Sequence, residues 1–201
     1  MSWILELDYA LFRAINGLAG KNALLDGAMK GLCNDHFVPF TLGFALVIFA
    51  LSGRNRREDG ERIKGTVEVF LAIVVSALLL QIITSFIHRS RPFVDHEVNL
   101  LFYRPTDWSF PSNPATATFS FFFAARPYHR GYSRLFLALA AAMSFARVFC
   151  GVHYPGDVLA GIVLAAFSAW LARRLEPLGS PFHRTLAYGL ERARSRILSR
   201  E

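Results

Sequence analysis

A histidine in the C-terminal half of this 201-residue chain stands between an arginine and an aspartate, in an arrangement suited to nucleophilic chemistry. His153 follows Arg147 by six residues and precedes Asp157 by four. A carboxylate that holds one nitrogen of an imidazole fixes the tautomer and leaves the other nitrogen free to attack. We therefore predict that His153 is a nucleophile and that Asp157 orients it. A second role for Asp157, as a capping residue of the helix that follows, stays open.

Two arginines are candidate ligands of an anionic substrate. Arg91 lies in the segment His88-Arg89-Ser90-Arg91-Pro92, and Arg147 interrupts an otherwise apolar stretch. A guanidinium is planar and can form paired hydrogen bonds to phosphate oxygens. The two arginines are thus predicted to hold a phosphate group together. The alternative for Arg147 is a side chain that extends to the membrane interface.

The tripeptide Ser112-Asn113-Pro114 is typical of a helix start. Serine or asparagine is favoured as the N-cap, and proline is favoured in the first turn. This alone explains the three residues structurally. The N-terminus of a helix also presents free N–H groups to an anion, so Ser112 and Asn113 are candidate phosphate ligands as well.

The elements that must position these residues are long apolar runs. A bilayer core of about 30 Å needs roughly 20 helical residues. A chain this short could not bury five such helices in a soluble core, so the runs predict an all-α, polytopic membrane helix bundle. The runs, almost free of charged residues, are Phe37–Gly53, Val69–Ile87, Trp108–Ala125, Leu135–Ala146 and Val158–Ala172.

The N-terminal segment has a different pattern. Apolar residues in Ser2–Ala19 recur at amphipathic spacing, interrupted by Glu6, Asp8 and Arg13. This spacing predicts a helix that lies at the membrane interface or packs on the bundle as a partly polar sixth helix. We therefore expect about six helices, five of them transmembrane, with a loop or short helix over residues 21–35.

The net charge of +7 is distributed unevenly along the chain. Fifteen of the 22 basic residues fall in three segments that alternate with the apolar runs, which is the pattern of cytoplasmic loops rather than of nucleic-acid binding. The loop 88–110 and the turn 150–156 should then lie on the external side. We expect a membrane domain over residues 1–175 and a basic cytoplasmic tail over residues 176–201. The fifteen are Arg54, Arg56, Arg57, Arg62, Lys64, Arg126, Arg130, Arg134, Arg173, Arg174, Arg184, Arg192, Arg194, Arg196 and Arg200.

Three motifs resemble the signatures of the type 2 phosphatidic acid phosphatase superfamily. They are Arg91-Pro92, Pro111-Ser112 and Arg147-x5-His153-x3-Asp157, and the resemblance covers about residues 8–175. The membrane branch of that superfamily forms a six-helix bundle. Within it, the chain is most similar to bacterial undecaprenyl-diphosphate phosphatases of the bacitracin-resistance type, especially over Gly151–Leu159.

The resemblance implies an activity and a location. The enzyme would hydrolyse undecaprenyl diphosphate to undecaprenyl phosphate and phosphate through a phosphohistidine at His153, oriented by Asp157. Arg91, Arg147 and Ser112 would bind the phosphate, without a metal or another cofactor. The protein would lie in the bacterial inner membrane with an external active site and a cytoplasmic C-terminus. Its partners would be the isoprenoid lipid diphosphate and membrane lipid, and a homodimer stays open.

Three positions depart from the family pattern. The smallest departure is Ala146, which stands where the third signature has a serine before its arginine. Thr84 stands where the first signature has a lysine, and Arg89 is the candidate substitute. Pro114 stands where the second signature has the histidine that protonates the leaving oxygen. A general acid contributes about 10²–10⁴-fold to rate, so activity should be reduced. The loss should matter less for a diphosphate, which expels a stable phosphate monoester, than for a monoester, which expels an alkoxide.

Other interpretations therefore stay open. The substrate could be another lipid phosphate, such as phosphatidylglycerophosphate, phosphatidic acid or lipid A. Pro114 could mark a deliberately trapped enzyme or a naturally slow one. It could also mark an inactive lipid-phosphate binder or transporter.

Overall fold

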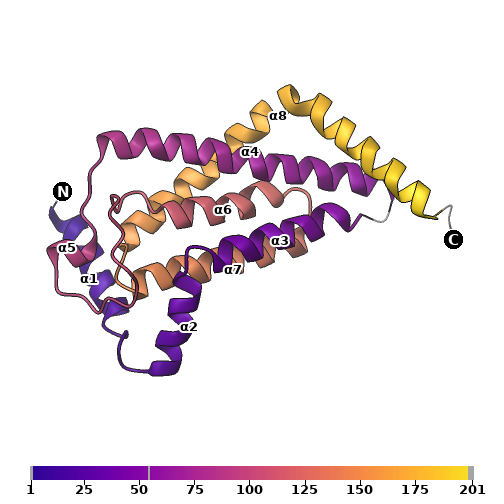
Figure 1. Cartoon of the computed structure of the whole chain (residues 1–201). Coiled ribbons are helices and arrows are strands. Elements are labelled where there is room, and N and C mark those ends of the chain that lie inside the picture. The colour runs from indigo at the N-terminus through magenta and orange to yellow at the C-terminus, as the bar shows by residue number, and fades with distance from the viewer. Residues whose placement is uncertain (1, 54, 199–201) are drawn as a thin grey trace.

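The computed structural model describes residues 2–53 and 55–198, and every regular element in them is an α-helix. The all-α prediction is confirmed. The helices are α1 (Ser2–Asn16), α2 (Ala23–Cys33), α3 (Phe37–Leu51), α4 (Arg56–Phe86), α5 (Pro92–Asp95), α6 (Asn113–Ala125), α7 (Arg130–Phe149) and α8 (Pro155–Leu198). In Figure 1, α3, α4, α6, α7 and the first part of α8 run lengthwise as a bundle, and α1, α2 and α5 gather at one end.

The membrane-spanning capacity differs from one apolar run to another. Each of the five runs forms a helix, but three stretches of the described chain are long and apolar enough to span alone: 57–86, 130–149 and 155–175. The pair α2 and α3, bent by 58° at a short break, passes the same test together. The described residues therefore form a polytopic membrane bundle with three candidate spans, or four if the bent pair is one span, where the runs predict five.

The third run makes a shorter helix than expected. The run 108–125 predicts a spanning helix, yet α6 has 13 residues, about 20 Å of helix. Residues 108–112 are not helical, because Pro111 has no N–H and disfavours helical geometry at Phe110 before it. Ser112 then caps α6, its hydroxyl accepting from the amide of Ala115 at 3.5 Å. The predicted helix start at Ser112-Asn113-Pro114 is thus confirmed.

Small residues let α6 and α8 approach closely. A Cβ added at Gly161 would lie 2.8 Å from the carbonyl oxygen of Ser112, so only glycine fits there. Ala115 and Ala165 are fully buried in the same contact region. Close packing of small residues is a usual way for membrane helices to associate. The contact places the beginning of α8 against the beginning of α6, where the amide of Ser112 donates to the carbonyl oxygen of Asp157.

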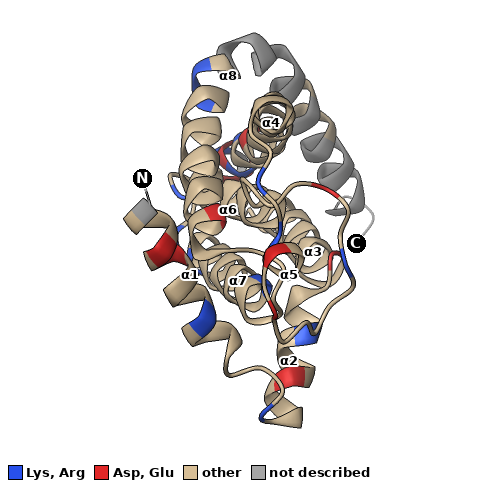
Figure 2. Ribbon diagram, turned by 90° about the vertical axis from the view of Figure 1, so that its left-hand side faces the viewer, with Lys and Arg blue, Asp and Glu red and all other residues tan. Residues whose placement is uncertain are grey.

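The helix α1 packs on the bundle with its polar face. Asp8, Phe12 and Asn16 are buried, whereas Trp3 and Leu11 on other faces are exposed. The side-chain amide of Asn16 donates to carbonyl oxygens in α7 and in the 88–112 loop. Figure 2 shows α1 at the periphery of the bundle, beside α7 and α8. Its exposed apolar side chains are suited to contact with lipid.

The bundle has two distinct ends. The loop 88–112 and the turn 150–154 lie at one of them, which we call the His153 end. They are joined there by a hydrogen bond from the amide of Leu101 to the carbonyl oxygen of Cys150. The turn 126–129 lies at the other, which we call the Arg130 end. Most side chains of the predicted basic tail, 176–201, lie outside the described residues.

Candidate active site

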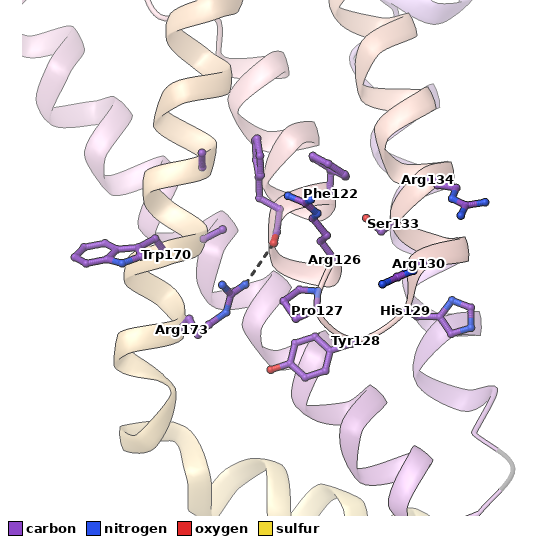
Figure 3. Close-up of a pocket in the computed structure, with 13 residues that line it drawn as sticks. Phe122, Arg126, Pro127, Tyr128, His129, Arg130, Ser133, Arg134, Trp170 and Arg173 are labelled. Carbon is purple, nitrogen blue, oxygen red and sulfur yellow. Dashed lines mark hydrogen bonds between the residues drawn. The ribbon is translucent and has the colours of Figure 1, made fainter.

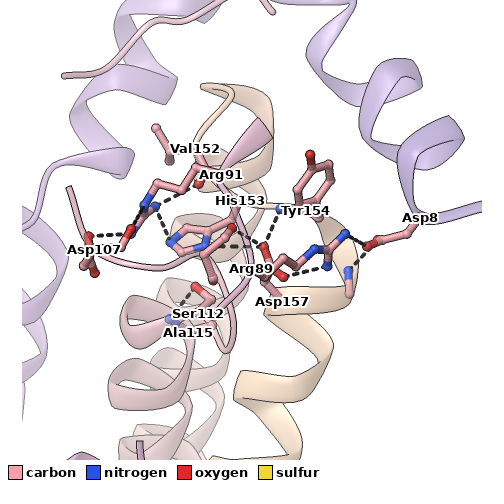
Figure 4. A network of polar contacts seen from close by, with 12 residues as sticks. Asp8, Arg89, Arg91, Asp107, Ser112, Ala115, Val152, His153, Tyr154 and Asp157 are labelled. Carbon is pink, nitrogen blue, oxygen red and sulfur yellow. Dashed lines mark hydrogen bonds and ion pairs between the residues drawn. The ribbon is translucent and has the colours of Figure 1, made fainter. Parts of the chain in front are cut away.

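A tight turn between α7 and α8 presents His153. Gly151 has a φ of +85°, a conformation that favours glycine, and it reverses the chain after α7. Pro155 begins α8 two residues after the histidine, a position where its missing N–H costs nothing. The turn holds His153 inside the protein, where 1% of its surface is exposed. Figure 4 shows His153 among the polar side chains around it.

The hydrogen bonds of His153 define its tautomer. Nδ1 lies 3.0 Å from the carbonyl oxygen of Ser109, which can only accept, so Nδ1 carries the proton. Nε2 lies 3.2 Å from Nη1 of Arg91, which can only donate, so Nε2 keeps its lone pair. Nε2 is therefore the nitrogen available as a nucleophile.

Asp157 reaches His153 mainly through Ser109. Its Oδ2 lies 3.7 Å from Nδ1 of His153, too far for a hydrogen bond. The same oxygen accepts from the hydroxyl of Ser109 at 2.5 Å and from the amide of Tyr154 at 2.9 Å. Ser109, which sequence reasoning missed, thus binds the ring with its carbonyl and the carboxylate with its hydroxyl. Asp157 also caps α8 by accepting from the amide of Tyr154, so the capping role considered for it is present.

Burial sets the protonation state of the histidine. Loss of hydration lowers the pKa of His153 to about 4, while the nearby Asp157 carboxylate raises it and the charges of Arg91 and Arg147 lower it further. Burial dominates because the imidazolium would be a charge taken out of water. The ring is neutral at pH 7, as a nucleophile must be.

Arg91 is fixed by three acceptors. Its side chain is 3% exposed and donates to the carbonyl oxygen of Val152 at 2.8 Å. It also donates to the carbonyl oxygen of Asp107 at 2.9 Å and to its carboxylate at 2.8 Å. Burial lowers the pKa of Arg91, although an arginine stays charged in proteins. The guanidinium is a positioned cation in contact with the candidate nucleophile.

Arg147 turns into the protein and does not extend to the interface. It is 3% exposed, and its Nη1 donates to the carbonyl oxygen of Cys33 at 2.9 Å and to Asp35 at 2.8 Å. Its Nε is buried without a hydrogen-bond partner in the described chain. An unpaired buried donor is energetically costly.

A cavity of about 310 Å³ brings the predicted phosphate ligands together. Arg91, Arg147 and Asn113 line it, and Pro114 lines it without a donor or an ionisable group. Asp35 and Asp107, which pair with the two arginines, also line it. Ser112, His153 and Asp157 are not among the lining residues, and Ser112 is fully buried as the cap of α6. In the described residues, no group of three or more His, Cys, Asp or Glu side chains is placed to hold a metal ion.

Arg89 corrects one expectation. It was the candidate substitute for the lysine absent at Thr84, but it does not line the cavity. Its guanidinium donates to Asp157 at 2.7 Å and to Asp8 at 2.7 Å, and it lies 3.9 Å from the ring centroid of Tyr154. The hydroxyl of Thr84 donates to carbonyl oxygens of its own helix. Arg89 therefore supports the carboxylate of Asp157 instead of meeting phosphate.

Asp8 is a second residue that sequence reasoning missed. One of its oxygens accepts from Arg89, and the other accepts from the amide of Gly156 at 2.7 Å. A Cβ at Gly156 would lie 2.8 Å from the Asp8 carboxylate, which explains the glycine at that position. The only sequence signal was an acidic residue in an amphipathic helix. The helix α1 is thus tied to the start of α8, beside Asp157.

Known proteins share this architecture and sequence. Residues 65–178 match the family described as the PAP2 superfamily. The bacitracin transport permease protein BcrC of Bacillus licheniformis is 31% identical over 96% of this chain and 92% of its own length. The undecaprenyl-diphosphatase BcrC of Bacillus subtilis is 28% identical over 88% of each chain. The crystal structure of a transmembrane PAP2 type phosphatidylglycerolphosphate phosphatase from Bacillus subtilis has the same fold, with a TM-score of 0.64, 18% identity and 88% of each chain covered.

Proposed function

The chain belongs to the PAP2 superfamily, and we propose that this lipid-phosphate phosphatase acts on undecaprenyl diphosphate. The products are undecaprenyl phosphate and inorganic phosphate. The observation that carries the proposal is the contact between Nε2 of the neutral His153 and Arg91, because Arg91 and Arg147 line one cavity. His153 itself lies behind Arg91 and does not line the cavity. The relative named as an undecaprenyl-diphosphatase supports this choice of substrate.

The proposed reaction has two steps. Nε2 of His153 attacks the terminal phosphorus, and the bond from that phosphorus to the bridging oxygen breaks, so that undecaprenyl phosphate leaves with the bonding electrons. The ring becomes positively charged, and the Ser109 carbonyl and the Asp157 carboxylate stabilise it. Water then attacks the phosphohistidine, releases phosphate and restores the neutral ring.

The arginines supply the electrostatic part of catalysis. Phosphoryl transfer depends mostly on positioning and on neutralising the charge of the equatorial oxygens. Arg91 and Arg147 are already held in the protein, so little reorganisation is needed when charge develops. The first-turn N–H groups of α6 near Asn113 add a favourable dipole.

Pro114 favours a diphosphate substrate. It lines the cavity at the position of the family's general acid and has no proton to give. A diphosphate needs that proton least, because its leaving group is a phosphate monoester. The basic residues at the Arg130 end support an external location for the site, because the positive-inside rule assigns such residues to the cytoplasm.

Phosphate release by the purified protein tests the proposal. Undecaprenyl diphosphate, phosphatidylglycerophosphate, phosphatidic acid and lipid A are compared in detergent micelles. We expect the first to be hydrolysed fastest and His153→Ala to lower its rate by about 10⁴-fold or more. His36→Ala is the matched control, since His36 is exposed and does not line the cavity. Unchanged release by His153→Ala would contradict the mechanism, and faster hydrolysis of another lipid would contradict the substrate.

A further inference from the structure

A second and larger cavity opens at the Arg130 end of the bundle. Its volume is about 750 Å³, and it lies among α6, α7 and α8. Figure 3 shows Phe122 of α6, Arg130 of α7, and Trp170 and Arg173 of α8 around it. It shares no lining residue with the cavity next to His153.

The lining carries four arginines and no carboxylate. Nε of Arg173 pairs with the buried carboxylate of Glu68 at 3.3 Å, so its charge is already balanced. The side chains of Arg126, Arg130 and Arg134 make no hydrogen bond or ion pair to any residue that the structure describes. The cavity therefore holds three uncompensated positive charges.

The local sequence concentrates these charges. The helix α6 ends at Arg126, a short turn follows, and Arg130 begins α7. Arg130 and Arg134 are four residues apart and share one face of that helix, where like charges repel. The N-terminus of α7 adds the positive end of its dipole. An anion bound at this place relieves the repulsion.

The depth of the cavity in the membrane indicates which kind of molecule carries the anionic group. Arg130 and Arg147, at the two ends of α7, are about 25 Å apart along the helix at about 1.5 Å per residue. This is close to the thickness of the hydrocarbon core, so the cavity lies at the headgroup level of the opposite leaflet. Trp170 and Phe122 form apolar walls beside the arginines, and tryptophan is enriched at that level. A ligand with a phosphate head and apolar chains fits both parts of the lining.

We propose that this cavity binds the phosphate headgroup of an anionic phospholipid from the leaflet opposite the phosphatase site. Arg126 and Arg130 contact the phosphate oxygens, and the acyl chains lie along Trp170 and Phe122. The site binds and does not hydrolyse: Nδ1 of His129, the histidine in its lining, accepts from the amides of Gly131 and Tyr132 as the cap of α7. The inference does not depend on the substrate of the phosphatase.

Lipid binding to the purified protein tests the proposal. Native mass spectrometry in detergent gives the affinity for phosphatidylglycerol and for phosphatidylcholine. We expect the Arg126→Gln/Arg130→Gln double variant to bind phosphatidylglycerol about thirtyfold more weakly and phosphatidylcholine unchanged. Arg57→Gln is the matched control, because Arg57 is an exposed arginine at the same end that pairs with Glu61 outside the cavity. Equal weakening by the control, or none by the double variant, would overturn the proposal.

Two further measurements distinguish a bound lipid from free phosphate and from a folding defect. Inorganic phosphate is added as a competitor, and displacement of phosphatidylglycerol at comparable concentrations would overturn the lipid in favour of free phosphate. The single variant Arg130→Gln is expected to weaken binding about fivefold and serves if the double variant does not fold. Loss of phosphatidylglycerol binding with phosphatase activity retained would separate this site from the catalytic one.

Discussion

The two ends of the bundle use arginine in opposite ways. At the His153 end, Arg91 and Arg147 are each 3% exposed and bound to main-chain carbonyls and to a carboxylate. At the Arg130 end, the side chains of Arg126 and Arg130 are exposed and have no partner among the described residues. Fixed cations suit a reaction in which charge must be met at a defined place, and exposed cations without a partner suit the binding of a headgroup. Burial and partners, more than residue type, therefore distinguish the two proposed phosphate sites.

Removing one arginine from each end should give the largest contrast. We expect Arg147→Gln to lower kcat for phosphate release by about 10³-fold, because a positioned cation at the developing charge is lost. Arg134→Gln should change kcat by less than about twofold, as is usual for an exposed residue. Steady-state kinetics in lipid-free detergent measures both. Similar losses of kcat in the two variants would contradict the assignment of different roles to the arginines at the two ends.

Placing a general acid at position 114 should show whether the need for a proton at the His153 end depends on the leaving group. We expect Pro114→His to raise hydrolysis of phosphatidic acid by about 10²-fold and that of undecaprenyl diphosphate by much less, because only the alkoxide needs the proton. Pro114→Gln, which adds a polar side chain without an acid, is the control. An equal gain on both substrates would refute the leaving-group argument.

Removing the ion pair between Arg89 and Asp157 should lower kcat by a smaller factor. We expect Arg89→Gln to lower kcat by about tenfold or more with little change in KM, because Arg89 holds Asp157 and does not line the cavity. Arg104→Gln is the control, an exposed arginine in the same loop that lies over Phe93. A raised KM with an unchanged kcat would instead place Arg89 on the substrate.

The pH dependence of stability should show the smallest effect. Burial lowers the pKa of His153 from 6.5 to about 4, so between these values the unfolded chain binds the proton and the folded chain does not. The stabilisation of the neutral ring is complete above pH 6.5 and is lost as the pH falls towards 4. Wild-type Tm should then fall over this range by about 5 °C more than the Tm of His153→Gln. Parallel curves would mean that His153 does not contribute.

Local patterns predicted much of this architecture. The five apolar runs became helices because hydrophobic segments of that length need helical hydrogen bonding in lipid. Ser112 was predictable as a cap from its neighbours alone. His153 and Asp157 were predictable as neighbours because they are four residues apart, with Pro155 beginning a helix between them. The length of α6 was not predictable in this way. Pro111 keeps the residues before Asn113 out of the helix, although the apolar run itself is unbroken there.

The missed residues share a physical reason. Ser109 contacts His153 across 44 residues, and Asp8 contacts Gly156 across 148. No spacing rule connects positions so far apart, and only the packing of α1 and the 88–112 loop brings them together. Arg89 was a candidate phosphate ligand, but in the structure it pairs with Asp157 and Asp8. Sequence shows that a residue is charged and does not show which opposite charge it contacts.

The pairs Asp35–Arg147 and Asp107–Arg91 have a consequence for turnover. The charges of the two arginines are balanced by these carboxylates. In the proposed reaction, an incoming phosphate group would therefore have to replace the carboxylates as partner of the arginines. An anion of low charge would gain little binding free energy by replacing a carboxylate, so the two ion pairs would favour highly charged phosphate groups. In the proposed reaction, the same two carboxylates would compete for the arginines after each cycle and so help to release the cleaved phosphate.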